Sequence, residues 1–120
     1  MHHWRLTLFS LCLLSAGPAF SVADSDVVRF VKLSEQFNAQ LSKSAIAGLS
    51  QDQRRIRAQC ILDTLEQQHG RGGVEAVMQL MQVLSVGTEF DDPTVVDFNS
   101  KFGDAYNAAS RNCLKVARNS

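Results

Sequence analysis

The sequence predicts an all-α fold, a small bundle-like domain of four helices. Beyond residue 24, apolar residues recur at spacings of three and four over most of the chain, which is the period of an amphipathic helix. No stretch alternates apolar and polar residues over the length of a strand. Serine, aspartate, proline and glycine stand between the periodic stretches, where helices begin and end.

The first 23 residues have the pattern of a secretory signal peptide. The positively charged start MHHWR precedes the apolar run LTLFSLCLLSAG, and the segment ends in small residues that suit cleavage after Ala23. Ala19 and Ser21 offer a second register for cleavage. Cys12 would be removed with this segment. We therefore expect residues 24–120 to form a single domain that is periplasmic or secreted.

The expected mature chain is close to neutral. Of the 12 basic and 12 acidic residues only Arg5 lies in the signal peptide, so residues 24–120 carry 11 cations and 12 carboxylates. This balance does not indicate a nucleic-acid partner. No apolar run beyond the signal is long enough to cross a membrane, so we expect no stable membrane insertion after cleavage. The length suffices for one hydrophobic core.

The first helix is expected from Ser25 to about Ala47. Ser25 or Asp24 can cap its start, and Gly48 follows its expected end. Charged residues fall on one side of this helix. The other side carries apolar residues at helical spacing, namely Val27, Phe30, Phe37, Leu41 and Ala45.

The second helix is expected over residues 50–69 and the third over residues 74–87, with the turn GRGG between them. Ser50 and Gln53 have the spacing of a capping box, and Gly70 can end the second helix. Apolar residues cover more than half the circumference of the third helix. This distribution predicts that the third helix is mostly buried.

The fourth helix is expected from Pro93 towards the end of the chain. Proline suits the first helical position, and Asp92 can cap the helix, which explains the acidic pair Asp91 and Asp92 without a calcium site. Gly103 can bend the helix. Its apolar stripe consists of Val95, Phe98, Phe102, Tyr106, Ala109, Cys113 and Val116.

Cys60 and Cys113 are the cysteines that remain after cleavage, and we expect them to form a disulfide in an oxidising compartment. For a loop of this length, chain entropy predicts a stabilisation of about 4 kcal/mol. In a square up-and-down bundle the second and fourth helices are diagonal, too far apart for this bond. The last helix is therefore expected to cross over and lie against the second.

Arg54, Arg55 and Arg57 form a basic cluster at the start of the second helix, where positive charge is mildly unfavourable. A solvated helix face explains such a cluster. The alternative is a contact with the acidic surface of a partner protein.

No catalytic constellation, metal site or cofactor motif is expected. Glu66 and His69 have the Glu-x-x-His spacing of di-iron sites, but the expected mature chain has no second histidine. Met78 and Met81 either pack in a solid core or line a pocket between helices. We therefore do not expect an enzyme.

These observations favour an exported helical protein that binds another protein, as an inhibitor, an immunity protein or a chaperone. Two alternatives stay open: a carrier of a small apolar ligand in the periplasm, and an enzyme or a subunit of an envelope assembly. An exposed apolar patch rimmed by charge would favour protein binding. An empty cavity in the core would favour the carrier.

Overall fold

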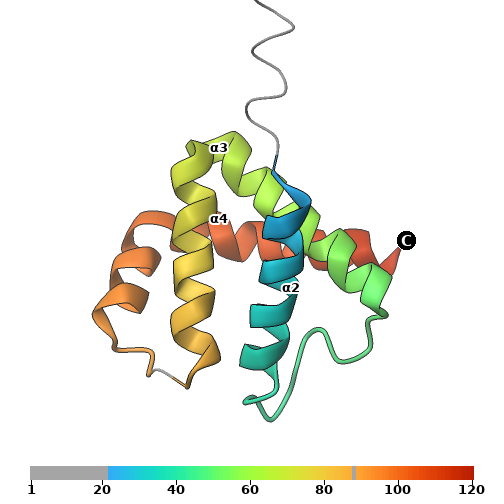
Figure 1. Ribbon diagram of the computed structural model, residues 1–120, viewed down its shortest axis with the longest axis horizontal. Helices are drawn as coiled ribbons and strands as arrows, with labels where there is room; N and C mark the ends of the chain where they lie inside the picture. Colours follow the sequence, from blue (N-terminus) through green and yellow to red (C-terminus); the bar gives the residue numbers. More distant parts are fainter. Residues whose placement is uncertain (1–21, 88) are drawn as a thin grey trace, which may run out of the picture.

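The structure is a computed structural model that describes residues 22–87 and 89–120. These residues form three α-helices, α2 (Asp24–Asn38), α3 (Gln51–Ser85) and α4 (Pro93–Arg118), and no β-strand (Figure 1). The predicted all-α class is confirmed. Cys12 and all but the last two residues of the predicted signal peptide lie outside the described residues.

Helix α3 changes direction at Gly70. This residue has φ 70° and ψ −165°, a non-helical conformation that glycine adopts more readily than any other residue because it lacks Cβ. Figure 1 shows the two limbs of α3 diverging from a shared apex. The predicted second and third helices correspond to these two limbs, which form one broken helix, so the described residues contain three helices.

The starts of α3 and α4 follow the predicted capping patterns. The predicted cap of α2 is wrong, because Asp24 and Ser25 lie inside the helix and its N-cap is Ala23. The Ser50 hydroxyl accepts a hydrogen bond from the Gln53 amide at 3.1 Å, and the Gln53 side chain accepts one from the Ser50 amide at 2.9 Å. The Asp92 carboxylate accepts a hydrogen bond from the Thr94 amide at 2.9 Å, and Pro93 is the first residue of α4.

Helix α2 ends at Asn38, well before the predicted end at Ala47. The Asn38 side-chain amide donates to the Ser34 carbonyl at 2.8 Å, and its oxygen accepts a hydrogen bond from the Ser44 hydroxyl at 3.0 Å. Asparagine and serine side chains offer the backbone an alternative to helical hydrogen bonds. Here these bonds hold the chain in an irregular segment between α2 and α3.

Two apolar residues of this irregular segment are buried, and they are not the predicted ones. Ile46 and Leu49 pack against Ala117 near the end of α4 and form a small second core. Leu41 and Ala45, which were expected on the apolar face of a continuing helix, are exposed. After α2 ends, the chain therefore contacts α4 through Ile46 and Leu49 and not through Leu41 and Ala45.

The main core lies where α2 and α4 pack against α3. Helix α3 therefore holds the other two helices together. Met78 and Met81 belong to this core. Its fully buried large side chains are Phe30, Ile61, Leu62, Leu65, Val74, Val77, Met81 and Cys113.

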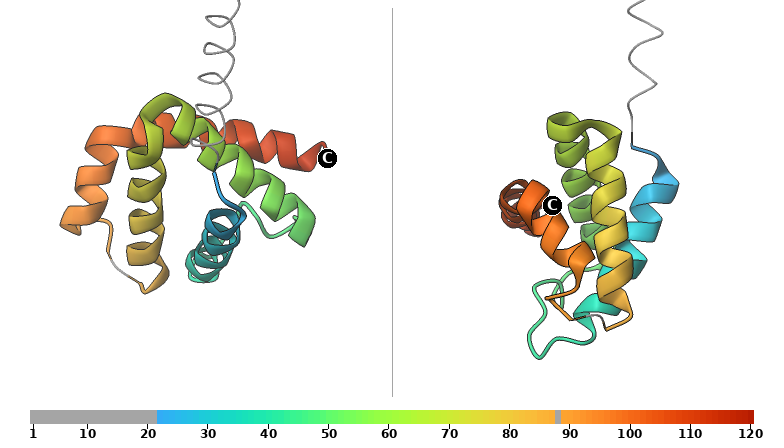
Figure 2. Two further views of the ribbon diagram at one scale, coloured as in Figure 1. Left: turned by 45° about the horizontal axis from the view of Figure 1, so that its top comes forward. Right: turned by 90° about the vertical axis from the view of Figure 1, so that its left-hand side faces the viewer.

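The disulfide between Cys60 and Cys113 joins the first limb of α3 to α4, with 5.6 Å between the Cα atoms. This pairing confirms the sequence prediction. Helix α4 bends part-way along, as the views in Figure 2 show, and Gly103 is buried within it. At its end the predicted stripe is wrong by one residue, because Val116 is exposed and Ala117 is buried.

Candidate functional site

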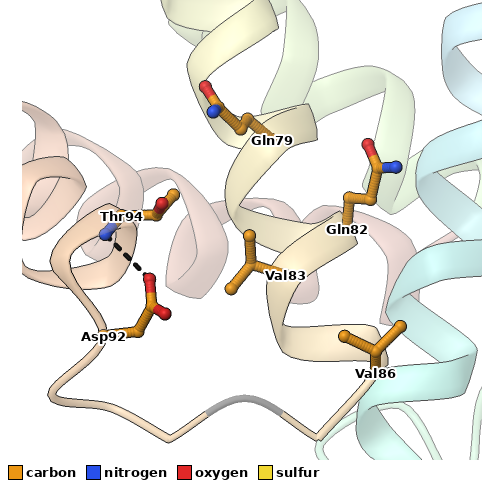
Figure 3. A pocket seen from close by; sticks show the side chains of 6 residues that line it. All are labelled: Gln79, Gln82, Val83, Val86, Asp92 and Thr94. Atoms are coloured by element: carbon orange, nitrogen blue, oxygen red, sulfur yellow. Dashed lines mark hydrogen bonds between the residues drawn. The ribbon is translucent and has the colours of Figure 1, made fainter.

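An open hollow of about 500 Å³ lies between the second limb of α3 and the start of α4. In Figure 3, Val83 lies between α3 and the residues that begin α4, and Val86 lies at the lower end of α3. Two glutamine side chains stand above these valines. The lining residues are Gln79, Gln82, Val83, Val86, Asp92 and Thr94.

The connection between α3 and α4 exposes large apolar side chains to an unusual degree. Val86 is 79% exposed and Phe90 is 67% exposed, the highest values among the large hydrophobic residues that the structure describes. Val96, in the first turn of α4, is 54% exposed. Single exposed apolar residues are common on soluble proteins, but three at or beside one connection indicate a contact surface.

Carboxylates accompany these apolar side chains. Glu89 and Asp91 are exposed, and Asp92 is partly exposed while it caps α4. None of the three forms an ion pair with another residue that the structure describes. We call this surface the acidic turn; it consists of Val86, Glu89, Phe90, Asp91, Asp92 and Val96.

A second, smaller pocket of about 170 Å³ lies where the end of α2 meets α3 and α4. The ring of Phe90 packs edgewise against the ring of Phe37, with 6.4 Å between their centroids, and both rings line this pocket. Its walls are mostly apolar, with three polar side chains on α4. The other lining residues are Leu80, Met81, Leu84, Val95, Asn99, Tyr106 and Asn107.

The three arginines of the predicted cluster do not share one exposed surface. Arg54 forms an ion pair with Glu35 of α2 and donates to the Ile46 carbonyl at 3.1 Å. Arg55 is exposed. Arg57 is only 7% exposed and donates to the hydroxyl of Ser110 in α4 at 3.2 Å. Two of the three therefore hold the fold together.

Arg57 has an unusual environment for a cation. It forms no ion pair with any carboxylate among the described residues, and its Nε atom is buried without a hydrogen-bond partner. Burial raises the pKa of the Tyr106 phenol, and the nearby Arg57 guanidinium opposes this rise. The positive charge of Arg57 therefore stabilises the ionised form of the Tyr106 phenol.

Tyr106 is the one tyrosine in the chain, so its titration can be followed without overlap from other tyrosines. We expect its midpoint in the folded protein to lie above the ordinary value of 10.0. Because the raised pKa disfavours tyrosinate, this contribution to stability is complete below about pH 10 and decreases as the pH rises further. Tyrosinate absorbance in native and denatured protein measures both midpoints.

The variant Arg57→Gln should move the native midpoint of Tyr106 still higher, because the opposing positive charge is lost. A control variant, Arg55→Gln, alters an exposed arginine of the same helix and should leave the midpoint in place. A native midpoint equal to the denatured one would contradict the burial of this phenol.

His69 lies at the end of the first limb of α3, three residues after Glu66. The His69 ring packs edgewise against Phe102 of α4, with 5.0 Å between the centroids. Within residues 22–87 and 89–120, no group of three histidine, cysteine or acidic side chains is placed to hold a metal ion. In the same part of the chain, no helix is both long and apolar enough to cross a membrane.

Sequence reasoning explained Asp91 and Asp92 as helix caps and did not identify the acidic turn. A signal was available, because residues 86–97 hold four carboxylates, several large apolar residues and no cation. Which of those side chains remain exposed depends on how the turn packs against α2 and α3. No protein-family model matches the chain, and no curated protein or solved structure matches it.

Proposed function

We propose that this is an exported helical protein that binds another protein through the acidic turn. The observation that supports the proposal is the exposure of Val86 and Phe90 beside the carboxylates of Glu89 and Asp91. Burial of these apolar side chains against a partner would favour binding, because it removes apolar surface from water. The surrounding carboxylates keep the free protein soluble and select the partner.

Export is supported by the first 23 residues and by the helix that follows them. Cleavage after Ala23 would leave Asp24, the first residue of α2, as the new N-terminus. The Cys60–Cys113 disulfide suits an oxidising compartment. An inhibitor, an immunity protein or a chaperone of the periplasm or the secreted space would have these properties.

The proposed contact of the arginine cluster with an acidic partner now depends on Arg55. This residue lines a shallow groove of about 380 Å³ between α2 and the start of α3, together with Val28 and Lys32. Arg55 and Lys32 are exposed there. Arg54 is tied to this groove through its ion pair with Glu35, which also lines it, whereas Arg57 contacts Ser110 of α4.

A small-ligand carrier is the second candidate. The pocket beside Phe37, Met81 and Phe90 has a volume of about 170 Å³. A cavity of about 150 Å³ lined by apolar side chains can hold a molecule of the size of benzene. This pocket would therefore accept a small aromatic molecule, well below the size of a lipid.

The protein-binding proposal predicts that Val86→Asp weakens capture of a partner from envelope extract by about tenfold or more, equal to about 1.4 kcal/mol. The control is Val28→Asp, which places the same charge on a valine of α2 that is 55% exposed. Both valines are exposed, so thermal unfolding should change little in either variant. Quantitative mass spectrometry of the captured proteins measures the difference.

Equal capture by the wild-type protein and Val86→Asp would contradict binding through the acidic turn. Loss of the same partner from Val28→Asp alone would instead locate the contact at the groove between α2 and α3. These two outcomes separate the two candidate surfaces.

A further inference from the structure

The charges of this nearly neutral chain are sorted along the sequence. Segments 39–60 and 108–120 together hold seven cations and one carboxylate side chain, that of Asp52. Segment 61–107 holds eight carboxylates and two cations. The seven cations are Lys43, Arg54, Arg55, Arg57, Arg111, Lys115 and Arg118.

The fold gathers the two basic segments at one end of the molecule. The disulfide joins Cys60 to Cys113, and Arg57 donates to Ser110, so the start of α3 lies on the second half of α4. Ile46 also packs against Ala117. In Figure 1 the end of α4 lies on the opposite side of the molecule from the connection between α3 and α4.

Three of these cations share one face of α4. Arg111, Lys115 and Arg118 are spaced by four and three residues, which places them on one side of a helix. All three are exposed, and none forms an ion pair within the described part of the chain. We call these three residues the basic face. Val116 is exposed next to it.

The helix dipole does not account for the whole basic face. Cations are favoured near the last carbonyl groups of a helix, which explains Lys115 and Arg118 in the last turn of α4. Arg111 lies before that turn. The face is therefore more basic than the stability of α4 requires.

We propose that the protein self-associates, with the basic face of one copy on the acidic turn of another. This inference goes beyond the proposed function, although it uses the same turn. Both halves of the contact are present in one chain: Glu89 and Asp91 supply unpaired carboxylates, and the basic face supplies unpaired cations. The exposed Val86 and Phe90 add apolar surface that Val116 can cover.

Charge also fixes the orientation of this contact. Two acidic turns facing each other would bring at least four exposed carboxylates together, and two basic faces would bring six cations together. Like charges in one interface are unfavourable, so opposite ends must meet. An antiparallel pair with two-fold symmetry makes the contact twice, and a dimer is therefore the expected species.

Sedimentation equilibrium of the purified mature protein tests this proposal directly. We expect a dimer at about 0.02 M salt that dissociates at about 0.5 M salt, because salt screens contacts between exposed charges. The dissociation constant should rise by about tenfold or more between these conditions. A monomer at both salt concentrations would overturn the proposal.

Charge reversal shows which residues make the contact. A turn variant, Glu89→Lys with Asp91→Lys, should be monomeric alone, and a face variant, Arg111→Glu with Lys115→Glu, should also be monomeric alone. Mixing the two variants should restore a dimer that contains one copy of each, because each reversed surface again meets the opposite charge. A mixture that stays monomeric would overturn the proposal.

A matched control reverses two carboxylates outside the turn, Asp63→Lys with Glu66→Lys. This control should dimerise as the wild-type protein does, within about threefold, if the contact is local and not a response to net charge. If the control loses dimerisation as fully as the turn variant does, the acidic turn is not the contact surface. Because only purified protein is used, self-association can fail while capture of a different partner through Val86 still succeeds.

Discussion

Replacing both Cys60 and Cys113 with alanine is expected to lower the free energy of unfolding by about 2 to 5 kcal/mol. The disulfide closes a long loop across a sequence separation of 53 residues and joins the first limb of α3 to α4. Without it, the unfolded chain gains conformational freedom, while the helix contacts of the folded chain remain. Unfolding in denaturant, compared with the oxidised wild-type protein, measures the loss.

Two controls accompany this prediction. Wild-type protein treated with reductant should have nearly the same free energy of unfolding as the double alanine variant, because both lack the same bond. A single Cys113→Ser variant should be less stable than the double variant, since it leaves a buried hydroxyl and an unpaired thiol. Free thiols in untreated mature protein, or a loss below about 1 kcal/mol, would contradict a structural disulfide.

The second large effect is expected for Phe30→Ala, at about 3 to 5 kcal/mol of stability lost. Phe30 is fully buried in the main core, and α2 is held to the rest of the fold through α3. The truncation leaves a cavity between these two helices. It should also loosen the ion pairs Arg54–Glu35 and Arg71–Asp26, which link α2 to α3.

Val28→Ala is the matched control, because Val28 lies on the same helix and is 55% exposed. It should change the free energy of unfolding by less than about 0.5 kcal/mol. Similar losses in the two variants would mean that α2 does not pack through Phe30. Denaturant unfolding curves with equal slopes make the comparison valid.

Local chemistry made the starts of α3 and α4 and the disulfide predictable. A capping box needs only Ser50 and Gln53 three residues apart, and Asp92 before Pro93 is equally local. Gly70 marks the break in α3 for a similar reason, since its positive φ suits glycine. The pairing of two cysteines followed from their number and from the expected compartment.

The end of α2 was not predictable from helical spacing alone. Asn38 ends the helix by bonds to Ser34 and Ser44, and Ile46 then packs on Ala117 of a helix far away in the sequence. The helical spacing of apolar residues continues past Asn38 to Leu41 and Ala45, but both of these side chains are exposed in the structure. The contact of Ile46 with Ala117, which is distant in sequence, determines which side chains of this segment are buried.

The candidate surfaces depend on tertiary structure even more strongly. Arg54, Arg55 and Arg57 are neighbours in sequence, yet their environments differ. Arg54 forms an ion pair, Arg55 is exposed to solvent and Arg57 is buried. The residues of the acidic turn lie close together in the sequence, but only the packing around them shows that Val86 and Phe90 stay exposed. Exposure is a property of the fold, and composition cannot supply it.

A photo-reactive amino acid at position 86 tests the binding role of the acidic turn most directly. Illumination of cells that express this variant should give an adduct between this protein and a different protein. The same amino acid at Val28, also exposed, should not give this adduct. Mass spectrometry distinguishes a foreign partner from a second copy. Equal adducts at both positions, or none from Val86 to a foreign protein, would contradict the proposed function.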